Sequence, residues 1–194
     1  MATQENSKTF LIILDAKILR DQNLFKIVEA DEEAVERLSR TLLRILEDKE
    51  GEIYQENVAK FGIPEEYVRK AFSEDSLLKA RNLEKAKFYL VMEENVEEIA
   101  GFAQTIMRNE GTVELDRIII FPEFTRKSLG SKLLQHVLNE SKKRGFKKVI
   151  VNTGKDEIRA RRFYEKNGFK KLEEYVVDTP WGKKLELVCY QFSF

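Results

Sequence analysis

The stretch that decides the fold runs from Thr112 to Gly145 and reads T-V-E-L-D-R-I-I-I-F-P-E-F-T-R-K-S-L-G-S-K-L-L-Q-H-V-L-N-E-S-K-K-R-G. It begins with a β-branched apolar run that ends at Pro122, as a buried strand does. Leucines and valines then recur at helical spacing from Leu129 to Leu138, with polar residues on the other face. The stretch therefore predicts a strand, a short basic loop from Thr125 to Gly130, and a helix.

The loop has the features of an anion site. A helix start presents free backbone N–H groups and the positive end of the helix dipole, which favour a phosphate or pyrophosphate. Arg126, Lys127 and Lys132 add positive charge, and Gly130 lets a ligand approach the backbone. An ordinary turn with solvated lysines would look much the same. The spacing of the glycines excludes both the nucleotide-triphosphate loop and the dinucleotide fingerprint.

A second segment, residues 157–169, reads E-I-R-A-R-R-F-Y-E-K-N-G-F. It resembles the N-x-x-A-x-x-F-Y-x-K-x-G-F signature of the GNAT family of N-acetyltransferases, with Glu157 in place of the leading Asn. The loop resembles the acetyl-CoA loop of the same family, [QR]-x-x-G-x-[GA], with Thr125 and Ser128 at two of its usual positions. Both segments occur in the family's order, and the resemblance covers about residues 24–192.

The resemblance implies an α/β GNAT fold, with a mixed, mostly antiparallel twisted sheet of six to seven strands flanked by about four helices. We expect strands at 24–29, 86–92, 99–107, 148–152, 170–178 and 184–192, besides the central strand. Helices are expected after Asp31, from Pro64, after the loop, and over 156–167, whereas 48–61 reads as loop. We expect residues 24–194 to form a single domain, preceded by an extension, residues 1–23, with an extra strand at Thr9 to Asp15.

By resemblance, the co-substrate is acetyl-CoA and the reaction is direct acetyl transfer to an amine in a ternary complex. Ile118, Ile119 and Ile120 would offer main-chain contacts to the thioester and pantetheine arm, while their side chains read as core. The remaining residues expected to bind acetyl-CoA lie in the loop and in the second motif: Thr125, Arg126, Lys127, Ser128, Leu129, Gly130, Ser131, Glu157 and Lys166.

Two residues are candidates for proton transfer. An alkyl ammonium must lose a proton before it can attack, and Glu114 stands where several family members place a base. The alternative for Glu114 is a charge at the exposed start of the strand. Tyr164 stands at the family's general-acid position and would protonate the leaving thiolate, although a buried tyrosine can also serve in packing alone.

Composition limits the remaining classes. The 194 residues carry 34 basic and 34 acidic side chains, so no bulk field attracts nucleic acid or an acidic membrane. Cys189, the single cysteine, excludes an internal disulfide and reads as a small buried hydrophobe, and no metal-ligand spacing occurs. We expect a cytoplasmic protein without a nucleic-acid or membrane partner, which could form a homodimer.

The acceptor is less defined by the sequence than the cofactor. The segment E-L-D-R-I-I-I looks closest to the polyamine acetyltransferases of the PaiA type, which favours a small amine or a polyamine. A peptide or protein amine is the alternative. A non-catalytic acyl-CoA sensor is a further one, because of the departures at Thr125, Ser128 and Glu157. Residues 48–72, together with the turn that carries Trp181, are the segments expected to shape the acceptor pocket.

Overall fold

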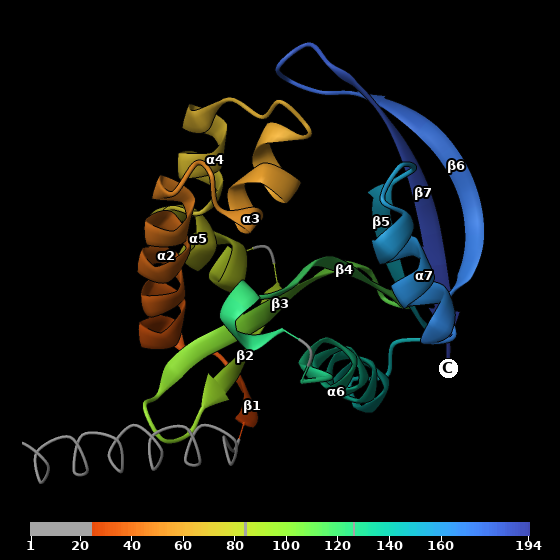
Figure 1. Cartoon of the computed structure of the whole chain (residues 1–194). Coiled ribbons are helices and arrows are strands. Elements are labelled where there is room, and N and C mark those ends of the chain that lie inside the picture. The colour runs from red at the N-terminus through yellow and green to blue at the C-terminus, as the bar shows by residue number, and fades with distance from the viewer. Residues whose placement is uncertain (1–24, 84, 126) are drawn as a thin grey trace, which may run out of the picture.

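The computed structural model describes residues 25–83, 85–125 and 127–194, and Figure 1 shows how their helices and strands are arranged. The strands are β1 (Phe25–Glu29), β2 (Ala86–Glu93), β3 (Glu98–Asn109), β4 (Thr112–Ile120), β5 (Lys148–Gly154), β6 (Lys170–Asp178) and β7 (Lys184–Ser193). The α-helices are α2 (Glu32–Glu47), α3 (Glu52–Tyr54), α4 (Glu65–Ala71), α5 (Glu74–Leu83), α6 (Leu129–Lys143) and α7 (Ile158–Lys166). A π-helical turn follows α3, and a 3₁₀ turn follows β4.

The strands form one seven-stranded sheet in the order β1-β2-β3-β4-β5-β7-β6. All neighbours are antiparallel except β4 and β5, which run parallel. That parallel pairing covers only Thr112–Glu114 opposite Lys148–Ile150, although β4 continues to Ile120 and β5 to Gly154. The sheet is therefore split between β4 and β5 beyond Glu114, and this split positions the site described below.

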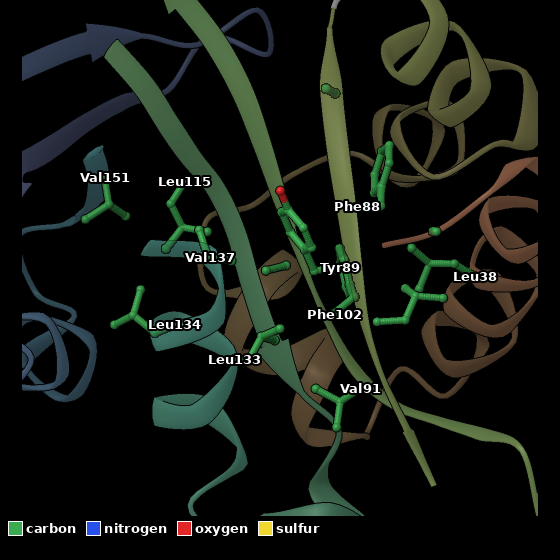
Figure 2. Close-up of a cluster of buried hydrophobic side chains, with 14 of the residues drawn as sticks. Leu38, Phe88, Tyr89, Val91, Phe102, Leu115, Leu133, Leu134, Val137 and Val151 are labelled. Carbon is green, nitrogen blue, oxygen red and sulfur yellow. The ribbon is translucent and has the colours of Figure 1, made fainter. Parts of the chain in front are cut away.

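Helices cover both faces of the sheet. Helices α2 and α5 lie on one face, and α6 lies on the other (Figure 1). Figure 2 shows Leu38 of α2 near Phe88 of β2, while Val137 of α6 lies near Leu115 of β4. All four side chains are almost completely buried. Each such side chain contributes roughly 1.5–3 kcal/mol through removal of apolar surface from water.

The expected GNAT fold is confirmed, and its strands fall close to their predicted bounds. Helix α2 begins as its sequence predicts, because the Asp31 carboxylate accepts a hydrogen bond of 2.9 Å from the backbone N–H of Ala34. Helix α7 ends at a left-handed glycine, Gly168, with φ of 88°.

The prediction of a loop over residues 48–61 is wrong. The segment forms α3 and the π-helical turn Gln55–Ala59. Its buried side chains, Ile53 and Val58, are five residues apart, which matches the wider π-helical turn and not the usual helical repeat. Pro64 is the N-cap of α4 and not its first residue, and α5 is an additional helix whose short apolar pattern did not predict it.

The expected extra strand at 9–15, and the N-terminal extension that contains it, lie outside the described residues. The boundary proposed at residues 23–24 thus stays a prediction. Across the described ranges, no helix has both the length and the apolar character needed to span a membrane.

Candidate active site

Glu114 lies at the point where β4 and β5 stop pairing. It faces Ile150 in the last pair of the parallel register, and its Oε1 accepts a hydrogen bond of 2.9 Å from Nδ2 of Asn152 on β5. Arg108 of β3 donates to the other carboxylate oxygen. The residue is 9% exposed, so it is not the solvated charge at a strand start that was the alternative interpretation. Two donors fix this carboxylate, which leaves lone pairs for a further proton or donor.

The last residues of β4 border the split. Ile118, Ile119 and Ile120 are half-buried and pair only with β3 on the other side, so their main chain faces the split. Gly130 lies in the first turn of α6, and a Cβ built on it would be 3.8 Å from the side chain of Ile120 and 3.8 Å from the ring of Phe163 on α7. Ile120 and Phe163 therefore both border Gly130. The end of β4, the start of α6, and α7 thus meet at one place.

The loop between β4 and α6 ends in an open helix start. After the 3₁₀ turn Pro122–Phe124, the hydroxyl of Thr125 donates to the carbonyl of Pro122 over 2.9 Å. The side chain of Ser128, the N-cap residue, makes no capping hydrogen bond to the described residues, and the first turn of α6 holds no acidic residue. The backbone N–H groups of Leu129, Gly130 and Ser131 therefore precede the first helical hydrogen bond, from Lys132 N–H to the Ser128 carbonyl at 3.1 Å. Arg126 lies outside the described residues.

Ser128 adopts a left-handed backbone conformation, with φ of 57° and ψ of 15°. A glycine reaches this conformation without strain, and glycine is the residue that the family motif has at this position. Gly130, by contrast, is an ordinary member of the first turn of α6. A Cβ added there would meet Ile120 and Phe163 at 3.8 Å, an ordinary contact, so packing within the chain does not require a glycine at this position.

Lys127 and Lys166 are placed differently from each other. Nζ of Lys127 lies 5.1 Å from the ring centre of Phe25 and 6.0 Å from that of Phe124, so the ammonium stays near the loop. Lys166 is exposed at the last turn of α7, about 13 Å along the helix axis from Glu157. Glu157 itself forms an ion pair with Lys60. The structure therefore brings Gly130 of the loop next to Ile120, and Lys166 lies apart from Glu157.

Tyr164 is buried in an aromatic cluster on α7. Its ring centre lies 5.4 Å from that of Phe163, 5.6 Å from Phe169 and 6.3 Å from Tyr190. Burial raises the pKa of the Tyr164 phenol well above its usual value, so the hydroxyl keeps its proton across the physiological range. Within the part of the chain that the structure describes, burial alone causes this rise in the pKa, and no side-chain hydrogen bond to the hydroxyl contributes. A protonated phenol can donate to a ligand.

Two distant segments meet above the face of the sheet that carries Glu114. Trp181, in the turn between β6 and β7, packs edge-on against Tyr67 of α4 with ring centres 5.6 Å apart. Its indole N–H donates to the carbonyl of Phe61 over 3.4 Å. The hairpin tip and the α3–α4 segment are the two elements at the top of Figure 1. Trp181 thus contacts the segment that was expected to shape the acceptor pocket.

Sequence reasoning missed three polar residues on that same face, Gln104, Asp116 and Arg117. Gln104 pairs with Arg117 and Thr105 with Leu115, so Asp116 is an extra residue, a β-bulge, in β4. All three line a cavity beneath α4 and α5. The adjacent charged pair Asp116-Arg117 just before the apolar run Ile118–Ile120 was the available signal, but a bulge leaves no mark in the sequence pattern.

Comparison with known proteins gives the family. The model of the acetyltransferase (GNAT) family matches residues 44–169, well over half of the chain. No curated protein matches the sequence.

Several solved structures share the fold of this chain. PaiA N-acetyltransferase from Thermoplasma acidophilum, in complex with coenzyme A, is 22% identical, with a TM-score of 0.63 over 88% of this chain and 99% of that one. A GNAT family acetyltransferase from Elizabethkingia anophelis with acetyl-CoA bound is 16% identical, with a TM-score of 0.57 over 88% and 98%. A GNAT family acetyltransferase from Staphylococcus aureus is 20% identical, with a TM-score of 0.63 over 88% and 99%. With its split sheet, open helix start and matching family model, the chain belongs to the GNAT family of acetyltransferases.

Proposed function

We propose that this acetyltransferase moves the acetyl group of acetyl-CoA to a small primary amine, by direct attack in a ternary complex. The observation that carries the proposal is the open start of α6 beside the unpaired edge of β4. Free N–H groups at the helix start suit the pyrophosphate, and the free main-chain edge at Ile118–Ile120 suits the pantetheine arm and thioester.

Glu114 is proposed as the base. Its carboxylate is held by Arg108 and Asn152 at the vertex of the split, so it can take a proton from the acceptor ammonium, directly or through a water. The neutral amine nitrogen then attacks the thioester carbon, and a main-chain N–H of β4 stabilises the oxyanion. Because the fold holds both reactants against one strand, no covalent acyl-enzyme is needed.

Tyr164 is proposed as the acid. When the tetrahedral intermediate collapses, the C–S bond breaks and the electron pair goes to sulfur, which takes the phenolic proton to give free coenzyme A. The nitrogen loses its extra proton to solvent, which leaves the neutral amide, and solvent reprotonates the Tyr164 phenolate. The protonated hydroxyl supports this role. Cys189 supports a step without a covalent intermediate, because the residue is buried and burial raises the pKa of its thiol, which disfavours the nucleophilic thiolate.

The acceptor class in this proposal is a small amine or polyamine, with a peptide or protein amine and a non-catalytic acyl-CoA sensor as the competing outcomes. A cytoplasmic location, a homodimer and the absence of a nucleic-acid partner stay predictions from the sequence.

The test is calorimetric titration with acetyl-CoA, followed in the same sample by thiol release on addition of polyamines, amino acids and peptides. Binding with amine-dependent thiol release supports the enzyme and names its acceptor. Binding without release for any amine supports the sensor instead. Failure to bind acetyl-CoA would contradict the proposal, and purified protein with a cooperative melting transition is the control for folding.

A further inference from the structure

A cavity of about 290 Å³ lies between helices α4 and α5 and strands β3 and β4. It opens on the face of the sheet that carries Glu114, because Ile106 lines the cavity and is the direct antiparallel partner of Glu114. The bulge residue Asp116 and its neighbour Arg117 close it on β4, immediately after the point where β4 and β5 separate. The cavity therefore adjoins the place where the amine must meet the thioester.

Two residues that line this cavity each carry a buried polar atom without a partner among the described residues. Gln104 is only 4% exposed, and its side-chain oxygen Oε1 accepts no hydrogen bond from any described residue. Nη1 of Arg117 is likewise buried without an acceptor among those residues. An unsatisfied buried polar atom costs about 1–3 kcal/mol, so a native fold keeps such atoms where a ligand or water will pair them.

The guanidinium of Arg117 is held in place from two sides. Its Nε lies 3.2 Å from Oδ2 of Asp116, and its central carbon lies 4.6 Å from the ring centre of Phe72. An arginine that is fixed in this way loses little freedom when it binds an oxygen. Burial raises the pKa of the Asp116 carboxyl, while the charge of Arg117 opposes that rise. Asp116 and Arg117 are thus partly buried, where hydrogen bonds and charges act more strongly than at an exposed surface.

Charge indicates what kind of amine fits. The cavity is lined by the cations Lys79 and Arg117 and by one anion, Asp116, so its lining carries an excess positive charge. A polyamine would bring further positive charge and no oxygen for Arg117. An amine with a carboxylate or carbonyl beside it would instead bring an acceptor for Nη1 of Arg117 and an N–H for Oε1 of Gln104.

We propose that this cavity selects acceptors in which a carboxylate or carbonyl oxygen lies next to the reacting amine, as in an α-amino acid or the amino end of a peptide, over polyamines. This inference rests on the acetyl transfer of the proposed function, and it departs from the acceptor named there by placing α-amino acids and peptide amino ends ahead of polyamines. The oxygen accepts from Arg117 and an N–H of the substrate donates to Gln104, which leaves the amine beside Glu114.

The test uses pairs of acceptors that differ only by the carboxylate, with thiol release from acetyl-CoA as the readout. Alanine and ethylamine, leucine and isopentylamine, phenylalanine and phenethylamine, and lysine and cadaverine form such pairs, with spermidine added as a polyamine. We expect kcat/KM to be about 10- to 100-fold higher for the amino acids, because the analogue leaves buried polar groups unpaired. The amino acid amides distinguish the two sources: activity kept with the amide points to a peptide end, and activity lost points to a free amino acid.

Variants assign the preference to the cavity. In Arg117→Gln the ratio within each pair should fall to near one, while acetyl-CoA binding is kept. Arg144→Gln makes the same change at an exposed position at the end of α6, outside the cavity, and should leave the ratio unchanged.

The outcomes separate the two proposals. Equal or higher kcat/KM with the decarboxylated amines or spermidine would overturn the inference and leave the acetyltransferase intact. Absence of thiol release with every acceptor would overturn both. The measurements on the unsubstituted protein decide the question even if Arg117→Gln fails to fold, which its melting curve reports.

Discussion

Replacing Ser128 with glycine should stabilise the fold by about 0.5–1 kcal/mol. Ser128 has φ of 57°, a left-handed conformation that costs a residue with a Cβ roughly 1–2 kcal/mol. Glycine avoids this strain, but it also stabilises the unfolded state by about 0.5–1 kcal/mol, because a glycine gives the unfolded backbone more conformational freedom. The serine hydroxyl makes no cap hydrogen bond to α6, so no stabilising contact is lost with it.

Thermal unfolding measures the effect. For a chain of this length, 0.5–1 kcal/mol corresponds to a rise in Tm of about 1–4 °C. Ser128→Ala keeps the Cβ and removes the hydroxyl, so its Tm should stay within about 1 °C of that of the unsubstituted protein. Glu97→Gly is a second control, because Glu97 has φ of 52° in the turn between β2 and β3, away from the loop.

The result that refutes the reasoning is a Tm of Ser128→Gly at or below that of Ser128→Ala, while Glu97→Gly still stabilises. That pattern would mean that the left-handed conformation at the start of α6 is not strained, and that the serine contributes something which its contacts do not reveal.

Three further predictions concern the proposed proton transfers and the one histidine. Glu114→Gln should lower kcat by about 10²-fold or more and change the pH–rate profile, whereas an unchanged profile and turnover would exclude the base role. Tyr164→Phe should lower kcat by a similar factor and preserve acetyl-CoA binding by calorimetry, because the ring and its packing remain; intact turnover would remove the acid role. Burial lowers the pKa of His136 on α6, so below about pH 6.5 the unfolded chain binds a proton that the folded chain resists. Chemical denaturation should therefore show stability falling as the pH drops through that range, and His136→Gln should flatten the decline; an equal decline in the variant would place its origin elsewhere.

Local signals in the sequence predicted much of the fold. The cap at Asp31 and the apolar run that ends at Pro122 are short-range patterns, and both lie where those patterns place them. Glu114 was found as a candidate because the family resemblance implies a base at this distance before the loop.

The parts that escaped prediction depend on contacts between distant segments. Trp181 and Phe61 are 120 residues apart, and nothing near either residue indicates their hydrogen bond. The bulge at Asp116 depends on how β3 and β4 align, and it puts Arg117 on the face of the sheet where Gln104 of β3 lines the cavity. Ser128 was recognised as a departure from the motif, but only the backbone angle explains why a glycine is usual at that position.

The short pairing between β4 and β5 also bears on how the molecule opens. Strands β1–β4 and β5–β7 are each joined by long antiparallel ladders, whereas the seam between the two groups has a register of only three residues. Amide groups along such a seam exchange with solvent more readily than those inside either ladder. A ligand that contacts both groups of strands would thus hold them together, and its binding should slow hydrogen exchange most at the ends of β4 and β5.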